Sequence, residues 1–499
     1  MEHFILLAYI FSLSVLFFYG IHAFVMVYHY FKHRDSDELH VSLHETPMVT
    51  IQLPLYNEMY VVRRLIEASC AIKYPKDKLE IQVLDDSTDE TVDLVKSIVN
   101  EMREKGYNIL HVRRLNRSGF KAGALKEGLR SAKGDFVAIF DADFVPQPDF
   151  LQKTIPYFFN DEKIGMVQTR WEHLNGEYSL MTRTQAMALD GHFVIEQNIR
   201  NKAGYFINFN GTGGIWRKTC IEDAGNWQSD TLTEDLDLSY RAQLRGWKFK
   251  FLRDVTSPAE LPAEINALKS QQFRWTKGAI ETARKMLPEV WKAKIPFRVK
   301  VHSTFHLTCN IVFPFIVLAS ILNVPLTFIK HEGGYDAYFN FMSIFVLAFF
   351  GSFLFYLYSQ KDIYPDWQRR IFLFPLFMAG SMGFAVNNSK AVLEGLFKRK
   401  SEFIRTPKYG IKEKSSSWAD KIYVPVKFSW TVIIEIALAL YCGFGALASL
   451  YYLELAAIPF QLLFTLGYGF VAWMSIQQAL EARRIKTAKA KLHMAPIAA

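Results

Sequence analysis

Cysteine is scarce in this chain of 499 residues, and its spacing argues against two kinds of site. The four cysteines are scattered without a CxxC pair, and two of them fall in long apolar runs: Cys70, Cys220, Cys309 and Cys442. A disulfide framework or a zinc site requires cysteines, or cysteines and histidines, at short patterned spacings. Neither is therefore expected here.

The glycine-rich loops that cradle phosphates are also missing. The sequence contains no GxxxxGK and no GxGxxG, and GTGG at 211–214 fits neither pattern. Those loops hold phosphate through backbone N–H groups near a helix N-terminus. A diphosphate bound by this protein would instead be held through a metal ion. Internal repeats and low-complexity linkers are absent as well.

Charge is almost absent from residues 4–28, a run long enough to cross a hydrocarbon core. The run is longer than the core of a signal peptide, and Lys32, His33 and Arg34 follow it in place of a cleavage site. A retained transmembrane helix within 1–34 is therefore expected. Four later apolar runs, within a membrane region at 291–480, also have a spanning length: 303–329, 339–358, 428–451 and 456–477.

Charge asymmetry decides how a further apolar run, 371–392, is interpreted. If it crossed the membrane, the basic segments at 398–408 and 482–491 would lie on the outer side, against the positive-inside rule. As an interfacial or re-entrant helix it leaves five crossings, with a basic cytoplasmic tail at 481–499. This topology and anionic lipid headgroups explain the net charge of +9 without a nucleic-acid partner.

Residues 46–290 have the composition of a soluble α/β domain. Short β-rich runs alternate there with stretches of helical spacing around 59–72, 89–105 and 121–132; the β-rich runs are 49–53, 79–84, 108–112 and 135–140. This alternation predicts a parallel sheet built from βαβ units. Ligands bind such sheets beyond the carboxyl ends of the strands. PLYNE, DDSTD and DAD each begin directly after one of these strands.

DAD consists of Asp141, Ala142 and Asp143, and residues two apart in a strand point to the same side. Two neighbouring carboxylates repel each other unless a cation joins them, and a diphosphate has the same requirement. Mg²⁺ or Mn²⁺, bound by carboxylate and phosphate oxygens, satisfies both. An isolated DxD is more often a solvated pair in a turn, but its place beside two other strand-end motifs favours a metal site.

Two further motifs supply groups for transfer chemistry. TED puts Glu234 and Asp235 before a helical stretch, with Thr233 as the expected N-cap. A carboxylate there can take the proton from a hydroxyl that attacks a sugar carbon. QQFRW at 271–275 offers an amide, a ring for stacking, and an Arg that can bond two diphosphate oxygens. The structural alternatives are a capping carboxylate and an amphipathic helix on the membrane.

Together these motifs resemble the D, DxD, D, QxxRW signature of membrane-embedded family 2 glycosyltransferases, the group of cellulose, hyaluronan and chitin synthases. QLPLYNE, IQVLDDSTDET, GFKAGALKEGL, FDADFVPQPDF and FNGTGGIWR are most similar to plant cellulose-synthase-like A and C mannan and glucan synthases. The resemblance covers about 48–290 closely. It implies a GT-A (Rossmann-like) α/β catalytic domain inserted in an α-helical transmembrane region. No regulatory carboxyl-terminal domain is visible, so control by a bound signalling nucleotide is not expected.

The resemblance also implies roles for individual residues. Asp235 would be the catalytic base, and Asp141 and Asp143 would hold the metal. The donor would be bound by Tyr56, Glu58, Asp86, Lys121 and Arg274. The acceptor would be bound by Phe209, Gly211, Thr212, Gly213, Gln271 and Trp275. FIRTPK at 403–408 resembles a gating loop of the pattern FxVTxK, but Arg405 stands where Val is usual, so a basic turn at the membrane is the alternative.

These roles imply a hexosyltransferase that inverts an α-linked donor into a β-linkage by one in-line displacement. A processive synthase that exports β-glucan, β-mannan or glucomannan is favoured, because QxxRW, a gating-like loop and enough spans to wall a channel occur together. Addition of one sugar to a lipid such as ceramide is the alternative. A non-enzymatic scaffold is disfavoured, because no motif carboxylate is lost. UDP-glucose and GDP-mannose both fit as donors, with the growing glycan and membrane lipids as other partners. The membrane would be a bacterial inner membrane or, in a eukaryote, a Golgi membrane.

Overall fold

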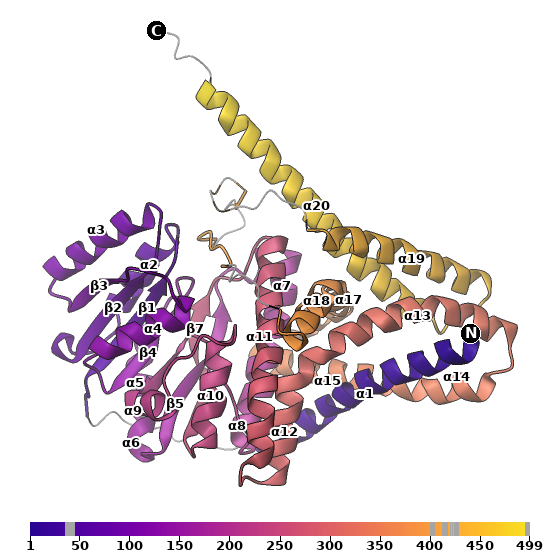
Figure 1. The fold of residues 1–499 in the computed structure, drawn as a ribbon, viewed down its shortest axis with the longest axis horizontal. Coiled ribbons are helices and arrows are strands. Elements are labelled where there is room, and N and C mark those ends of the chain that lie inside the picture. The colour runs from indigo at the N-terminus through magenta and orange to yellow at the C-terminus, as the bar shows by residue number, and fades with distance from the viewer. Residues whose placement is uncertain are drawn as a thin grey trace.

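The computed structural model describes residues 1–34, 45–399, 405–411, 418–419, 421, 423 and 429–494, with side chains in the last range described up to 487. A sheet-containing part lies at one side of the molecule and a bundle of long helices at the other (Figure 1). Two helices, α11 (Ile265–Lys292) and α12 (Phe297–Thr308), lie between them.

In the described part of the chain, seven strands form one sheet in the order β3-β2-β1-β4-β6-β5-β7. They are β1 (Val49–Leu55), β2 (Leu79–Asp85), β3 (Ile109–Arg113), β4 (Phe136–Ile139), β5 (Ile164–His173), β6 (Gly214–Arg217) and β7 (Lys248–Ala259). The predicted strands β1 to β4 are parallel to one another. β6 pairs antiparallel with both β4 and β5, so the sheet is mixed.

Helices cover both faces of this sheet. The helices of the sheet-containing part are η1 (Lys76–Lys78), α2 (Val62–Cys70), α3 (Thr91–Glu104), α4 (Phe120–Ser131), α5 (Phe150–Thr154), α6 (Tyr157–Asn160), α7 (Leu180–Asp190), η2 (Gly191–Gln197), α8 (Asn198–Lys202), α9 (Lys218–Asp223) and α10 (Glu234–Leu244). The predicted helical stretches around 59–72, 89–105 and 121–132 correspond to α2, α3 and α4.

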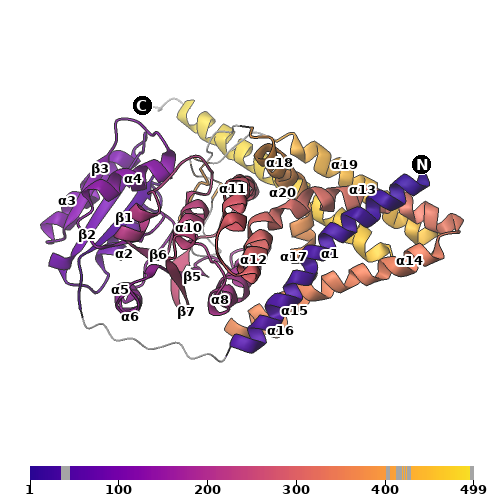
Figure 2. The same ribbon diagram turned by 60° about the horizontal axis from the view of Figure 1, so that its bottom comes forward.

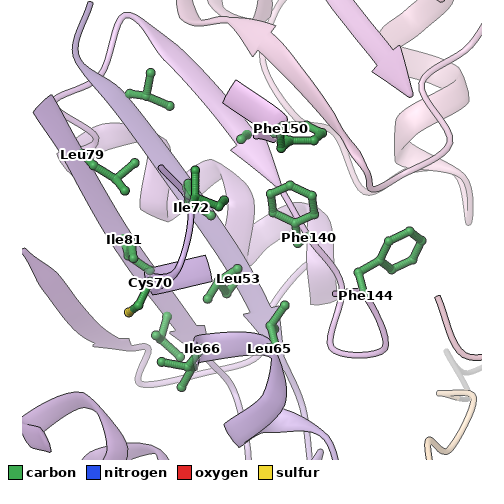
Figure 3. Packing of buried hydrophobic residues seen from close by; sticks show 14 of the residues in the cluster. Leu53, Leu65, Ile66, Cys70, Ile72, Leu79, Ile81, Phe140, Phe144 and Phe150 are labelled. Atoms are coloured by element: carbon green, nitrogen blue, oxygen red, sulfur yellow. The ribbon is translucent and has the colours of Figure 1, made fainter. Parts of the chain in front are cut away.

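Strand alternation divides the apolar residues between two cores. Leu53 of β1 packs with Leu65 and Ile66 of α2 on one face of the sheet (Figure 3). Val137 of β4 and Leu125 of α4 belong to the core on the other face. Because each such side chain contributes about 1.5–3 kcal/mol when fully buried, these two cores hold the strand ends in fixed positions.

Five helical segments of the described chain are long and apolar enough to cross a membrane, at the positions where the five runs predict them. They are Glu2–His33 (α1), Phe297–Glu332 (α12, η3 at Cys309–Ile311, and α13 at Val312–Glu332), Asp336–Ile363 (α14 at Asp336–Met342, η4 at Ser343–Phe345, and α15 at Val346–Ile363), Thr431–Tyr451 (α19) and Ile458–Thr487, which lies in α20 (Ile458–Met494). α1 packs against α13 and α15, and α19 packs against α20 (Figure 2).

The apolar run 371–392 is divided between two helices. α17 (Phe374–Gly383) follows the short α16 (Trp367–Ile371), and α18 (Ala385–Leu396) begins after Phe384. Only Phe384 separates α17 from α18. The interfacial or re-entrant placement of this run stays a prediction.

Candidate active site

A cavity of about 180 Å³ lies at the carboxyl ends of the parallel strands, where the three strand-end motifs meet. It is called the sheet-edge cavity below. The predicted site residues that line it are Tyr56, Glu58, Asp86, Lys121, Asp141, Asp143, Gly211, Thr212, Asp235, Gln271, Arg274 and Trp275. The structure therefore brings together residues from β1 to α11 that are more than 200 positions apart in the sequence.

Phe209 and Gly213, both expected at the acceptor, do not contribute to this cavity wall. Phe209 is buried in the core, with its ring centroid 5.6 Å from that of Trp216. Gly213 has a positive φ of 64°, and its carbonyl accepts a hydrogen bond from the Thr169 hydroxyl at 2.7 Å. The roles expected for Phe209 and Gly213 at the acceptor stay predictions; the Phe209 ring belongs to the core, and Gly213 forms part of the backbone turn. Asn210, which the sequence analysis did not select, faces the cavity instead.

Each of the two DAD carboxylates forms an ion pair with a lysine. Lys121 Nζ lies 2.5 Å from Asp141 Oδ1, and Lys408 Nζ lies 2.5 Å from Asp143 Oδ2. Among the described residues, no third Asp, Glu, His or Cys joins them in a metal-binding group. Two carboxylates on one cavity wall, each already attracting a cation, suit a hard divalent ion that takes its other oxygens from a ligand and water.

Glu234 and Asp235 begin α10 and face the same cavity. Burial raises the pKa of the Asp235 carboxyl, and the adjacent Glu234 raises it further. Asp235 is thereby a stronger base than an exposed aspartate. Thr233 takes the N-cap position, as predicted, although its side chain bonds Thr282 at 3.1 Å and makes no capping hydrogen bond.

Arginines surround the end of the cavity that contains Tyr56. The Arg117 guanidinium carbon lies 3.3 Å from the centroid of the Tyr56 ring. Arg114 donates to both carboxylate oxygens of Asp86, with an Nε to Oδ1 distance of 2.9 Å. Neither arginine was selected from the sequence, although RLNR at 114–117 directly follows β3.

Part of the predicted gating loop lies in the cavity wall. Arg405, Thr406 and Lys408 line the cavity, and the Arg405 guanidinium donates two hydrogen bonds to Glu58, at 2.9 and 3.0 Å. Burial raises the pKa of Glu58 to about 8, and the charge of Arg405 opposes this rise. Phe403 and Ile404, the first two residues of FIRTPK, lie outside the described residues.

Comparison with known proteins agrees with this geometry. Residues 47–278 match the family described as "Glycosyltransferase like family 2". Glucomannan 4-beta-mannosyltransferase 7 of Arabidopsis thaliana is 35% identical over 451 residues, which cover 87% of this chain and 79% of that protein. The chain belongs to glycosyltransferase family 2.

Other relatives of this glycosyltransferase match a shorter stretch. Probable glucomannan 4-beta-mannosyltransferase 4 of Oryza sativa subsp. japonica is 47% identical over 280 residues, 55% of this chain and 50% of its own length. The match spans about half the length of several of these curated relatives.

A solved structure shares the fold. The mannosyltransferase PcManGT from Pyrobaculum calidifontis, in complex with GDP-Man and Mn²⁺, superposes with a TM-score of 0.56 at 17% identity, covering 79% of this chain and all of that one. The predicted GT-A fold is thereby confirmed.

A second cavity, of about 400 Å³ and called the inner cavity below, adjoins the sheet-edge cavity of this family 2 glycosyltransferase. Six residues border both cavities: Trp171, Asn210, Thr233, Asp235, Gln271 and Trp275. The inner cavity extends to Phe377 of α17 and Cys309 of η3. Cys309 also borders a third cavity, of about 550 Å³, among α1, α13, α15 and α20. The three cavities thus form a series from the sheet edge into the spanning helices.

Proposed function

We propose that the protein is a processive, inverting glycosyltransferase that polymerises a β-linked mannan or glucomannan from GDP-mannose and exports it across the membrane. The observation that carries the proposal is the series of cavities. The carboxylates of the sheet-edge cavity adjoin an inner cavity that leads toward membrane-spanning helices. A glycan extended at Asp235 would leave the site along this series.

The donor is proposed from chemistry and from the relatives. The relatives are named as glucomannan mannosyltransferases, and the structure of shared fold was solved with GDP-Man and Mn²⁺. In this chain, Tyr56, Glu58 and Asp86 would bind the base and ribose. Lys121 and Arg274, which face the same cavity, would bind the diphosphate.

Asp141 and Asp143 would hold Mg²⁺ or Mn²⁺. Such an ion, when bound, neutralises charge on the diphosphate as it leaves. Lys121 and Arg274 place positive charges on the same cavity wall. Because these charges are already in position before the reaction, they stabilise the leaving diphosphate without reorganisation of solvent.

Asp235 would act as the general base. Its carboxylate takes the proton of the acceptor hydroxyl, while that oxygen bonds to the anomeric carbon and the bond from this carbon to the diphosphate oxygen breaks. Attack opposite the leaving group inverts the anomeric centre, so an α-linked donor gives a β-linkage. Gly211, Thr212, Gln271 and Trp275 would position the acceptor, because they line the cavity beside Asp235.

The membrane arrangement is part of the proposal. The catalytic part, 46–290, and the basic segments at 398–408 and 481–494 would lie on the cytoplasmic side, where anionic lipids attract Lys and Arg. Residues 495–499 of the predicted tail lie outside the described residues. The interfacial segment 371–392 and a gating role for 405–408 belong to the same proposal, with a Golgi membrane as the location in a eukaryote.

Membrane vesicles that contain the protein test this function. They are supplied with Mn²⁺ or Mg²⁺ and, in separate reactions, labelled GDP-mannose and UDP-glucose, and the product is sized. A high-molecular-mass product from GDP-mannose that a β-mannanase degrades is expected. A product from UDP-glucose alone would refute the donor, and a single lipid-extractable monoglycoside would refute processivity.

A further inference from the structure

One polar cluster of the inner cavity has no part in the proposed chemistry. It lies on η2 (Gly191–Gln197), a π-helical segment inserted between α7 and α8, and π-helical turns are frequent at functional sites. His192 and Glu196 of this segment line the inner cavity, with 26% and 29% of their side chains accessible. Both side chains therefore present polar atoms to a group bound in this cavity.

The hydrogen bonds of this cluster have a defined direction. Gln197 Nε2 lies 2.7 Å from the Asn208 backbone carbonyl, which can only accept, so this end of Gln197 is its NH₂ group. The same NH₂ group lies 2.6 Å from Asn210 Oδ1. Asn210 therefore presents its own NH₂ group to His192 Nε2, at 2.9 Å.

His192 is consequently held in one tautomer. Its Nε2 accepts from Asn210, so Nδ1 carries the proton and donates to Glu196 Oε2 at 3.0 Å. Arg200 donates to the other Glu196 oxygen at 3.3 Å. Burial acts to raise the pKa of Glu196, but the bond from His192 and the charge of Arg200 outweigh it and keep the pKa below its usual range. Glu196 is thus an ionised acceptor that faces the cavity.

The place of the cluster relative to the base determines what it can bind. Asn210 and Asp235 border both cavities, and Glu196 borders the inner one. When the attacking acceptor hydroxyl lies at Asp235, the rest of the acceptor chain lies in the inner cavity, beside Glu196 and Asn210. Sugar hydroxyls donate well to a carboxylate, and an ionised acceptor roughly doubles the strength of such a hydrogen bond.

We infer that Glu196 and Asn210 form a second sugar subsite, which binds hydroxyls of the β-linked hexose unit behind the terminal acceptor unit. His192 is a positioning residue that fixes both of them. The inference rests on the proposed function and deepens it, because it assigns acceptor recognition to Glu196, outside every quoted motif, and to Asn210, which was not selected within FNGTG.

The first test compares product lengths from GDP-mannose in vesicles that contain the wild type, Glu196→Gln, His192→Ala or His173→Asn. His173 is a matched control, because it pairs with Asp190 at 3.1 Å near the same segment, and neither residue borders the inner cavity. Glu196→Gln and His192→Ala are expected to shorten the product, while His173→Asn leaves the length as in the wild type. Unchanged lengths in Glu196→Gln would overturn the subsite.

The second test uses purified protein with mannose or β-mannobiose as the added acceptor. In the wild type, kcat/KM is expected to be about tenfold higher for the disaccharide, the effect of one charged hydrogen bond. Glu196→Gln removes this preference and leaves the KM for GDP-mannose unchanged, which a general structural defect would not do. A preference retained in Glu196→Gln, or absent from the wild type, contradicts the subsite. Failure of the wild type to transfer mannose to any acceptor or polymer contradicts the proposed function itself.

Discussion

Lys408 Nζ lies 2.5 Å from Oδ2 of Asp143, so a lysine from the carboxyl-terminal part of the chain holds a carboxylate of the proposed metal site. Three residues earlier, Arg405 holds Glu58 through two hydrogen bonds. Both cations face groups that would approach a nucleotide diphosphate and its ion. Segment 405–408 and the donor therefore meet at the same wall of the sheet-edge cavity.

Lys408→Met is expected to tighten binding of Mn²⁺ to the donor-free protein several-fold. The reason is that the lysine and the ion compete for the Asp143 carboxylate, and removal of one cation favours the other. Titration of Mn²⁺ by electron paramagnetic resonance measures the change. Lys153→Met is the control, because Lys153 is paired with Asp149 on the surface at 2.6 Å. Equal or weaker Mn²⁺ binding in Lys408→Met would show that the pair does not compete with metal.

Asp235→Asn is expected to lower kcat by about 10²-fold or more, because the amide cannot accept the acceptor proton. GDP-mannose binding should stay within about twofold of the wild type, since Asp235 is assigned to the acceptor proton and other residues to the donor. Turnover of labelled donor and isothermal titration calorimetry with GDP-mannose separate these two effects. Substantial residual turnover would remove Asp235 from the role of base.

Glu234→Gln is expected to move the acidic limb of the kcat profile to lower pH. The base works in its deprotonated form, so turnover falls as the pH drops through the pKa of Asp235. Burial and the charge of Glu234 both raise that pKa, and the substitution removes the second cause. The measurement is kcat against pH for the two proteins with saturating GDP-mannose. An unchanged or upward-shifted limb would assign the limb to another group.

Most of the parallel half of the fold could be predicted from the sequence because β1, β2 and β4 are buried on both faces and form β-rich runs. β6 (GIWR) begins with Gly and ends with Arg, and β7 includes Lys248, Lys250 and Arg253, so neither shows that pattern. Their place in the sheet depends on tertiary pairing, such as that of β5 with β7. The meeting of the strand-end motifs could also be predicted, because each follows one of these parallel strands and their carboxyl ends lie at one edge of the sheet.

The pairings within the site could not be predicted, because they join segments that carry no local signal for each other. GHFVIEQ at 191–197 matches none of the motifs of the sequence analysis. This π-helical segment packs against α15, where a Cβ atom on Gly191 would lie 2.6 Å from a ring carbon of Tyr356. The position of His192 and Glu196 in the inner cavity thus goes with a tertiary contact to α15, for which the sequence has no motif.

The helix that carries QQFRW depends on a buried ion pair for its position. Lys269 of α11 donates to Glu435 of α19 at 2.7 Å and to Ser475 of α20 at 3.0 Å, and the two charged side chains are only 5% and 0% exposed. Removal of one partner leaves the other as an uncompensated buried charge, which costs about 3–5 kcal/mol. Glu435→Gln is therefore expected to destabilise the protein by about 3 kcal/mol. Because α11 also carries Arg274, Glu435→Gln should lower the rate of sugar transfer as well.

The same helix provides the control for this prediction. Glu289 of α11 pairs with Lys292 at 3.1 Å, but both side chains are more than half exposed, so Glu289→Gln should cost at most about 1 kcal/mol. Unfolding of the detergent-solubilised variants by heat measures both effects. The double change Lys269→Met with Glu435→Leu should recover much of the lost stability, because it leaves no charge unpaired. Equal losses for Glu435→Gln and Glu289→Gln would mean that the buried pair does not hold α11 against α19 and α20.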